Sequence, residues 1–251
     1  MAENLMQALL LPLFLAATLL SNGAQARAEK KPAQRPIPAG ARVVAIEYDG
    51  SAEDFAPVRK MQSLRHVSLV NGRIEKAHID HLVALEQLES VTLSDTYASG
   101  DWFEALSKLP KLRKLEVGFH NFPKDADLQK IGKLKELRVL IVSEVVSAHD
   151  GWLVCLETLT YLRDLDLGRM SITDKGAELI SKSKSIETLD LCETQITDKA
   201  LKHLEAMPKL RYVSVNDTEV TEAGVIAFQK LRPEVTVRFE GELYIKGRRV
   251  E

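Results

Sequence analysis

Three aspartates occur in a part of the sequence where paired carboxylates could do chemistry. Asp164 and Asp166 are separated by one residue, and Asp190 follows Asp166 at a distance of 24 positions. If the two segments are neighbouring strands in register, the side chains of Asp166 and Asp190 lie about 5 Å apart. Carboxylates at that spacing perform acid–base chemistry or bind a divalent cation in several enzyme classes.

The other groups that a catalytic site needs are not placed beside these aspartates. No His, Ser or Lys has the position of a nucleophile or proton shuttle, and an open sheet offers no pocket that excludes water. We therefore predict a protein that is not an enzyme, with no catalytic residues, no metal site and no bound cofactor. The alternative is an enzyme or a divalent-metal site on the carboxylate ladder of Asp164, Asp166 and Asp190.

These aspartates belong to a unit that the chain repeats. Ile-Thr-Asp at 172–174 returns as Ile-Thr-Asp at 196–198 and as Val-Thr-Glu at 220–222, each time after a Leu-x-x-Leu-x-Leu-like run. The leucine-type residues that begin the units are Ala41, Leu64, Leu88, Leu112, Leu137, Leu162, Ile186 and Leu210. A repeat of about 24 residues is typical of a solenoid.

Each unit predicts one strand followed by one helix. The third and fifth residues beyond each start are aliphatic, as Leu165 and Leu167 are, and this alternation indicates a strand with one buried face. The second half of the unit has apolar residues at three-residue steps, as at Leu201, Leu204 and Met207, which predicts one buried stripe on a helix.

Three threonines indicate where helices begin. Thr173, Thr197 and Thr221 have the position of an N-cap hydroxyl that accepts a backbone N–H, and an acidic residue follows each. One strand and one helix cannot bury their apolar sides alone, so the stacked units must share a core between a parallel sheet and a layer of helices. Because helices are wider than strands, we predict an α/β solenoid shaped as a horseshoe, with the sheet concave and the helices convex.

The pattern Leu-x-x-Leu-x-Leu-x-x-Thr-x-Ile-Thr-Asp is clearest in the units that begin at Leu162, Ile186 and Leu210. In this pattern the chain resembles leucine-rich-repeat proteins of the ribonuclease-inhibitor-like type, as in short exported bacterial arrays. The resemblance extends over about 190 residues. It implies a non-catalytic protein-binding module, and it does not select the partner.

The residues between the inward-pointing ones face the concave side. There the strand of Val139 and Ile141 is apolar, the next two strands are acidic, and an aromatic residue follows. We predict that the partner-binding patch consists of Val139, Ile141, Asp164, Asp166, Asp190 and Tyr212. Because an apolar anchor beside a charged flank is typical of interfaces, we expect a protein partner with a basic patch. Alternatively, the two aliphatic residues are ordinary exposed side chains.

Composition argues against nucleic acid as a partner. The formal net charge of -2 at pH 7 over 251 residues creates no strong field, so we expect no nucleic-acid binding. The two cysteines, Cys155 and Cys192, lack the spacing of metal ligands, and the predicted fold places them on opposite sides, too far apart for a disulfide.

The start of the chain has the features of an export signal. Residues 5–20 are an apolar block, and the small-residue triplet 24–26 follows it, so we predict a signal peptide over 1–26 and a periplasmic or extracellular location. The segment before the block contains Glu3 and no Lys or Arg, which export signals usually have. We expect contact with a membrane only through this segment if it is not cleaved.

The remaining boundaries follow from composition and from the end of the repeat. Residues 27–40, rich in proline and basic side chains, predict an extended tether. The repeat domain of about eight units is predicted over 41–239, with a final strand at 235–239, and residues 240–251 form a C-terminal cap or tail over the sheet edge. A third function class is a structural accessory subunit of the cell envelope.

Overall fold

The computed structural model describes most of the repeat region. The described residues are 43–47, 55–70, 74–94, 101–118, 125–143 and 148–250, and they all belong to one compact unit, Ile37–Glu251. The predicted signal peptide (1–26) and tether (27–40) lie outside the described residues. Within the described ranges, no helix has the length and apolar character needed to cross a membrane.

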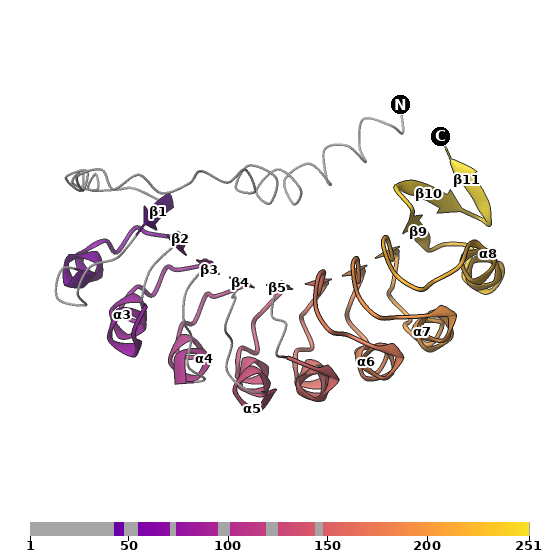
Figure 1. Cartoon of the computed structure of the whole chain (residues 1–251). Helices are drawn as coiled ribbons and strands as arrows, with labels where there is room; N and C mark the ends of the chain where they lie inside the picture. Colours follow the sequence, from indigo (N-terminus) through magenta and orange to yellow (C-terminus); the bar gives the residue numbers. More distant parts are fainter. Residues whose placement is uncertain are drawn as a thin grey trace, which may run out of the picture. The chain divides into compact units, whose positions relative to one another are not determined.

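The strands of the described region form one sheet in the order of the sequence (Figure 1). They are β1 (Val43–Glu47), β2 (His66–Val70), β3 (Ser90–Ser94), β4 (Lys114–Gly118), β5 (Val139–Ser143), β6 (Asp164–Asp166), β7 (Thr188–Asp190), β8 (Tyr212–Ser214), β9 (Thr236–Phe239), β10 (Glu242–Ile245) and β11 (Arg248–Val250). Strands β1 to β9 run parallel to one another, and β10 pairs antiparallel with both β9 and β11. The sheet lies on the inner side of the curved repeat region, so the prediction of a concave parallel sheet is confirmed.

The inward-pointing aliphatic residues stack in register from one strand to the next. Leu165 pairs with Leu189, and Leu189 pairs with Val213. All three side chains are buried in a single hydrophobic core that runs through the described units. This stacking confirms the solenoid, because each unit covers the apolar side of the unit before it.

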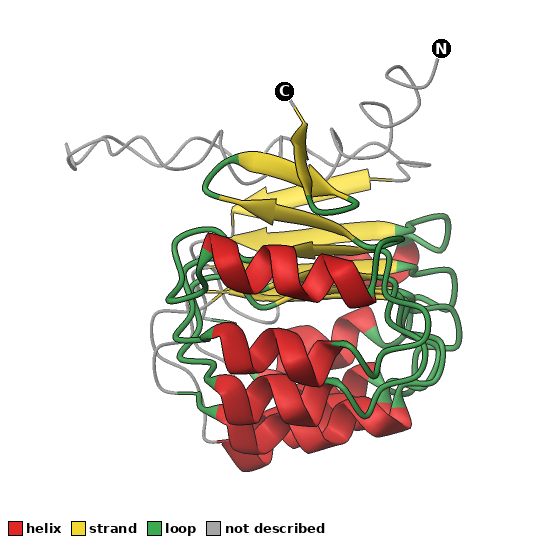
Figure 2. Ribbon diagram, turned by 90° about the vertical axis from the view of Figure 1, so that its right-hand side faces the viewer, coloured by secondary structure: helices red, strands yellow, loops and turns green. Residues whose placement is uncertain are grey.

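Helices cover the outer side of the sheet (Figure 2). The α-helices are α3 (Lys76–Leu82), α4 (Asp101–Leu106), α5 (Asp125–Leu128), α6 (Asp174–Ile180), α7 (Asp198–Leu204) and α8 (Glu222–Leu231), and the 3-10 helices are η1 (Ala56–Lys60), η2 (Gln129–Lys133) and η3 (Asp150–Thr158). The middle units therefore use 3-10 turns for much of the outer layer.

The spacing of apolar residues is compatible with the 3-10 helix η3 but does not select it, because Leu201 and Leu204 have the same spacing in the α-helix α7. Leu153, Leu156 and Leu159 recur every three residues and are all buried, which matches the three residues per turn of a 3-10 helix. Helix η3 also packs closely against η2. A Cβ atom at Gly132 would lie only 2.9 Å from Thr158 Oγ1, so a side chain there would clash. At this glycine, η2 and η3 pack directly against each other.

The three predicted N-caps are present. Thr173 accepts a hydrogen bond from the Lys175 N–H, Thr197 from Lys199 and Thr221 from Gly224, at 3.1 to 3.2 Å. Each hydroxyl satisfies one of the backbone donors left open in the first turn of its helix.

The acidic residue after each threonine binds the next unit. Asp174 Oδ1 accepts the backbone N–H of Thr197 and Asp174 Oδ2 accepts its hydroxyl, both at 2.8 Å. The same two bonds join Asp150 to Thr173 and Asp198 to Thr221. We call these contacts the Asp–Thr bridges. They connect the starts of successive helices, whereas the sequence pattern had indicated only a favourable charge at each helix end.

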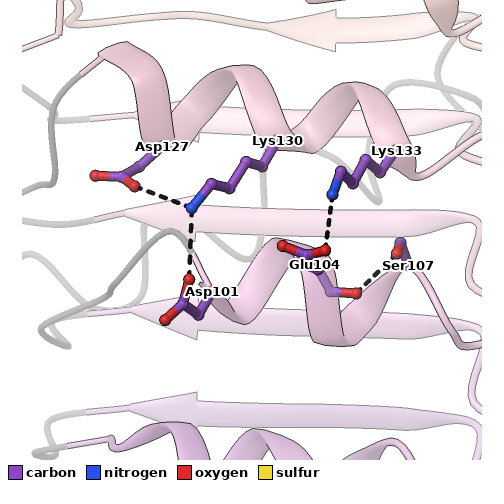
Figure 3. A network of polar contacts seen from close by, with 6 residues as sticks. All are labelled: Asp101, Glu104, Ser107, Asp127, Lys130 and Lys133. Atoms are coloured by element: carbon purple, nitrogen blue, oxygen red, sulfur yellow. Dashed lines mark hydrogen bonds and ion pairs between the residues drawn. The ribbon is translucent and has the colours of Figure 1, made fainter.

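Exposed ion pairs also join successive units on the outer side (Figure 3). Lys130 Nζ lies 3.4 Å from Asp101 Oδ1 and 3.5 Å from Asp127 Oδ1, and Lys133 Nζ lies 2.8 Å from Glu104 Oε1. The bond from Lys133 lowers the pKa of Glu104. Exposed pairs contribute little to stability because water screens them.

The C-terminal strands attach to the last unit through buried polar contacts. The Tyr244 hydroxyl donates to Glu222 at 2.8 Å, and Glu222 begins α8 as Asp198 begins α7. Gln229 Nε2 donates to the carbonyls of Val235 and Tyr244, and its Oε1 accepts the Gly247 N–H at 2.7 Å. Strands β10 and β11 thereby continue the sheet beyond the last unit.

Candidate functional site

The register of the sheet arranges the concave side chains into two rows that cross the strands. The first row consists of Ser68, Thr92, Glu116, Ile141, Asp166, Asp190, Ser214 and Arg238. The second row consists of His66, Ser90, Lys114, Val139, Asp164, Thr188, Tyr212 and Thr236. In both rows, each residue is the direct cross-strand partner of the next.

The six residues predicted for the partner-binding patch lie on four consecutive strands, β5 to β8. Val139 is the partner of Asp164, and Ile141 is the partner of Asp166. Both aliphatic side chains are half-buried and keep part of their surface exposed. On the preceding strand β4, Lys114 Nζ lies 3.0 Å from Glu116 Oε2, so the apolar strand has charged groups on both sides.

Asp166 and Asp190 occupy equivalent positions on β6 and β7. Asp166 Oδ1 accepts the Gly168 N–H at 2.9 Å, and Asp190 Oδ1 accepts the Cys192 N–H at 2.8 Å. In each case the carboxylate binds the backbone two residues further on, as an aspartate does in a turn. These aspartates therefore shape the turn at the end of the strand as well as contributing negative charge to the concave face.

Burial makes the ionised forms of Asp164 and Asp166 less favourable. Burial raises the pKa of Asp166 to about 6, and the negative charges of Asp190 and Glu116 add to this effect. Burial also raises the pKa of Asp164, against the hydrogen bond from Thr188. Ionisation of Asp164 and Asp166 therefore destabilises the folded protein. A cation placed over these carboxylates would reduce the destabilisation.

Ser214 does not contribute to the surface, although its place in the strand predicts an outward side chain. It is fully buried, and its Oγ lies 2.8 Å from Cys192 Sγ. Tyr212, two residues earlier on the same strand, is half-buried. Burial raises the pKa of Tyr212, and the nearby Arg238 guanidinium opposes this rise. The phenol is therefore a neutral hydroxyl at neutral pH.

Arg238 is a concave residue that the predicted patch omitted. It lies on β9 as the partner of Ser214 and places a permanent positive charge near Tyr212. The sequence contained the information needed to place Arg238, because it lies between Val237 and Phe239, whose side chains are buried. Alternation in the predicted final strand would have assigned it to the concave face.

The two cysteines, Cys155 and Cys192, are free, and they form no disulfide with each other. Burial raises the pKa of Cys155 to about 12. Burial, followed by the negative charge of Asp190, raises the pKa of Cys192 to about 12. Both therefore remain thiols at neutral pH, and a thiol is a poor nucleophile and metal ligand. In the part of the chain that the structure describes, no three His, Cys, Asp or Glu side chains are arranged to hold a metal ion.

Comparison with solved structures finds, among others, internalins of low sequence identity. An internalin (inlF) from Listeria monocytogenes is 13% identical with a TM-score of 0.49, and the match covers 73% of this chain and 56% of that chain. Internalin C2 from the same organism is 15% identical with a TM-score of 0.47, covering 72% of this chain and 83% of that chain. The chain thus spans little more than half the length of the first internalin. No curated protein sequence matches it significantly.

The match to a family model agrees with the stacked, in-register core. The family model for a leucine-rich repeat region matches residues 53–244, which include the units that begin at Leu64 to Leu210, the strands β2 to β9 and most of β10. A solenoid of this family supports a protein-interaction module, because its stacked strands create an extended concave surface. The chain therefore belongs to the leucine-rich-repeat family.

Proposed function

We propose that this protein binds another protein through the centre of its concave sheet and has no catalytic role. The proposed contact residues are Val139, Ile141, Asp164, Asp166, Asp190 and Tyr212. The observation that carries the proposal is the apolar strand β5, which places two partly exposed aliphatic side chains directly beside acidic strands.

The chemistry of this patch resembles that of known interfaces. Aliphatic and aromatic side chains at the centre supply the energy of association, and the charged residues around them select the partner. Completing the burial of Val139 and Ile141 contributes about 2 kcal/mol in total. The carboxylates favour a partner with a basic patch, because a nearby cation stabilises their ionised form.

Capture of the partner tests the proposal. The full chain is tagged, incubated with extract of its native host, and compared with a Val139→Asp/Ile141→Asp variant. We expect the variant to lose the protein that the unaltered chain retains, because two new charges occupy the apolar centre. Circular dichroism melting checks that the variant is folded, and Val139→Ser/Ile141→Ser offers a milder change.

The matched control is Val154→Asp on the outer helix η3. Val154 is 45% exposed, so this variant makes one aliphatic-to-aspartate change, half the added charge of the double variant, at an exposed position outside the concave face. It should retain the partner. If the control and the folded variants of Val139 and Ile141 retain equal amounts of the partner, the central patch is not the binding site.

We also propose that the protein is exported, as the apolar block and small residues before position 27 suggest. Mass spectrometry of the N-terminus in the native host tests this. A mature chain that begins near Arg27 supports export with cleavage, and an intact Met1 contradicts cleavage of the signal.

A further inference from the structure

We propose that the concave face binds an extended segment of its partner in one direction, with an apolar residue over β5, a basic residue over β6 and β7, and an acidic residue over β9. This inference rests on the proposed protein-binding function. It adds Arg238 to the binding surface and defines the order of groups that the partner must present.

The order follows from the first row of concave residues. Going from β5 to β9, this row reads Ile141, Asp166, Asp190, Ser214 and Arg238, each the cross-strand partner of the next. The row is therefore apolar at one end, acidic in the middle and basic at the other end. A partner segment laid along it meets opposite charges in only one of its two directions.

The acidic and basic parts of the row are separated by a position without accessible charge. Ser214 is fully buried between them. Tyr212, the outward residue on the same strand, is a neutral phenol whose pKa is raised by burial. Strand β8 therefore acts as a spacer, which keeps the site for a cation apart from the site for an anion.

Arg238 carries the positive charge at the β9 end of the row. It is half-buried, and its guanidinium lies close enough to Tyr212 to oppose the rise that burial causes in the pKa of the phenol. A guanidinium carries five N–H donors and remains charged at every physiological pH. A partner carboxylate beside it also gains from the planar, two-donor geometry that arginine offers.

The strand spacing sets the spacing of the partner's residues. Neighbouring strands are about 4.8 Å apart, so the midpoint of β6 and β7 lies about 7 Å from β5, and β9 lies about 19 Å from β5. An extended segment advances about 3.4 Å per residue. Residues at i, i+2 and i+6 cover about 7 and 20 Å, and they share one face because their separations are even.

Two labelled peptides of identical composition test this order. The first, Leu-Ser-Lys-Ser-Thr-Ser-Glu-Ser, has the predicted order of apolar, basic and acidic residues. The second, Leu-Ser-Glu-Ser-Thr-Ser-Lys-Ser, exchanges the charges. Binding to the full chain is measured by fluorescence anisotropy at low ionic strength, where surface charges are least screened.

We expect the first peptide to bind roughly tenfold more tightly, because only this peptide can place its leucine over β5 and both of its charges opposite the row at once. The second peptide must either meet like charges or lie reversed, without its leucine over β5. Arg238→Glu should abolish or invert this preference, and Arg238→Gln should reduce it. Lys202→Glu, which makes the same change of charge at an exposed position on α7, should leave it intact. Equal binding of both peptides, or a preference that survives Arg238→Glu, overturns the inference.

The two proposals fail in different ways. If neither peptide binds but capture of the native partner still depends on Val139 and Ile141, the order of groups is wrong and the binding patch stands. If capture does not depend on those residues, the central patch is wrong whatever the peptides do.

Discussion

The Asp166 carboxyl has two roles, one structural and one electrostatic. Its Oδ1 holds the turn after β6 by accepting the Gly168 N–H, while burial and the charge of Asp190 raise its pKa to about 6. The ordinary pKa of an aspartate in an unfolded chain is about 3.9. The folded state therefore binds the proton more tightly than the unfolded state does.

This difference predicts how stability depends on pH. Below about pH 4 the carboxyl is protonated in both states and its ionisation costs nothing. The cost develops between about pH 4 and 6 and is complete above pH 6, where it reaches up to about 3 kcal/mol. Asp166→Asn keeps an oxygen acceptor for Gly168, so we expect it to raise the free energy of unfolding at pH 7.5 and to change it little at pH 4.

Urea denaturation of both proteins at the two pH values measures the effect. Asp217→Asn, a change at an exposed aspartate, is the control and should leave the pH dependence of stability as it is. A gain from Asp166→Asn that is the same at pH 4 and pH 7.5 would contradict the assignment of the cost to ionisation.

At the scale of elements, the Asp–Thr bridges couple each helix start to the next. Thr197 accepts the Lys199 N–H as an N-cap and also donates its hydroxyl to Asp174. Thr197→Val keeps the shape of the side chain but removes both bonds. We expect the free energy of unfolding to fall by about 1 to 3 kcal/mol.

Chemical denaturation checks this prediction against Thr236→Val on β9. Thr236 is a half-buried threonine that begins a strand, so the same substitution there tests the loss of a hydroxyl without the loss of a helix cap. We expect it to change stability by less than about 0.5 kcal/mol. Equal effects of the two substitutions would show that the bridges do not stabilise the array.

At the scale of the repeat domain, each unit is stabilised by packing against the units next to it. Because a unit contacts only its neighbours, a destabilising substitution at one end of the array affects that end alone. The C-terminal strands depend on Gln229, whose buried side chain binds three backbone groups: the Val235 carbonyl just before β9, the Tyr244 carbonyl in β10 and the Gly247 N–H in the turn after β10. Gln229→Leu leaves those groups without their partners, which costs about 3 kcal/mol.

We expect this loss to appear as local opening. Hydrogen exchange measured by mass spectrometry should increase in β9 to β11 and stay unchanged in β2 and β3, which lie several units away. Gln195→Leu, a change at an exposed glutamine, is the control and should affect neither region. A uniform increase across all units would mean that the domain unfolds as one cooperative body.

Much of the concave patch could be predicted before the structure was known. Side chains alternate strictly in a strand, so the burial of Leu140 and Val142 requires that Val139 and Ile141 face the other way. The 24-residue repeat placed Asp166 and Asp190 at equivalent positions of neighbouring strands. Alternation did not reveal that Ser214 is buried, because its contact with Cys192, in the turn after the preceding strand β7, depends on how the two units pack.

The sequence by itself determined the repeat period, the inward residues, the family resemblance and the N-cap threonines. These are local properties, since apolar spacing and a hydroxyl before a helix act within one unit. Only the tertiary structure decided the 3-10 turns of the middle units, the Asp–Thr bridges and the burial of Ser214. Each of these depends on how far one unit is displaced against the next, and that displacement is set by packing across the whole stack.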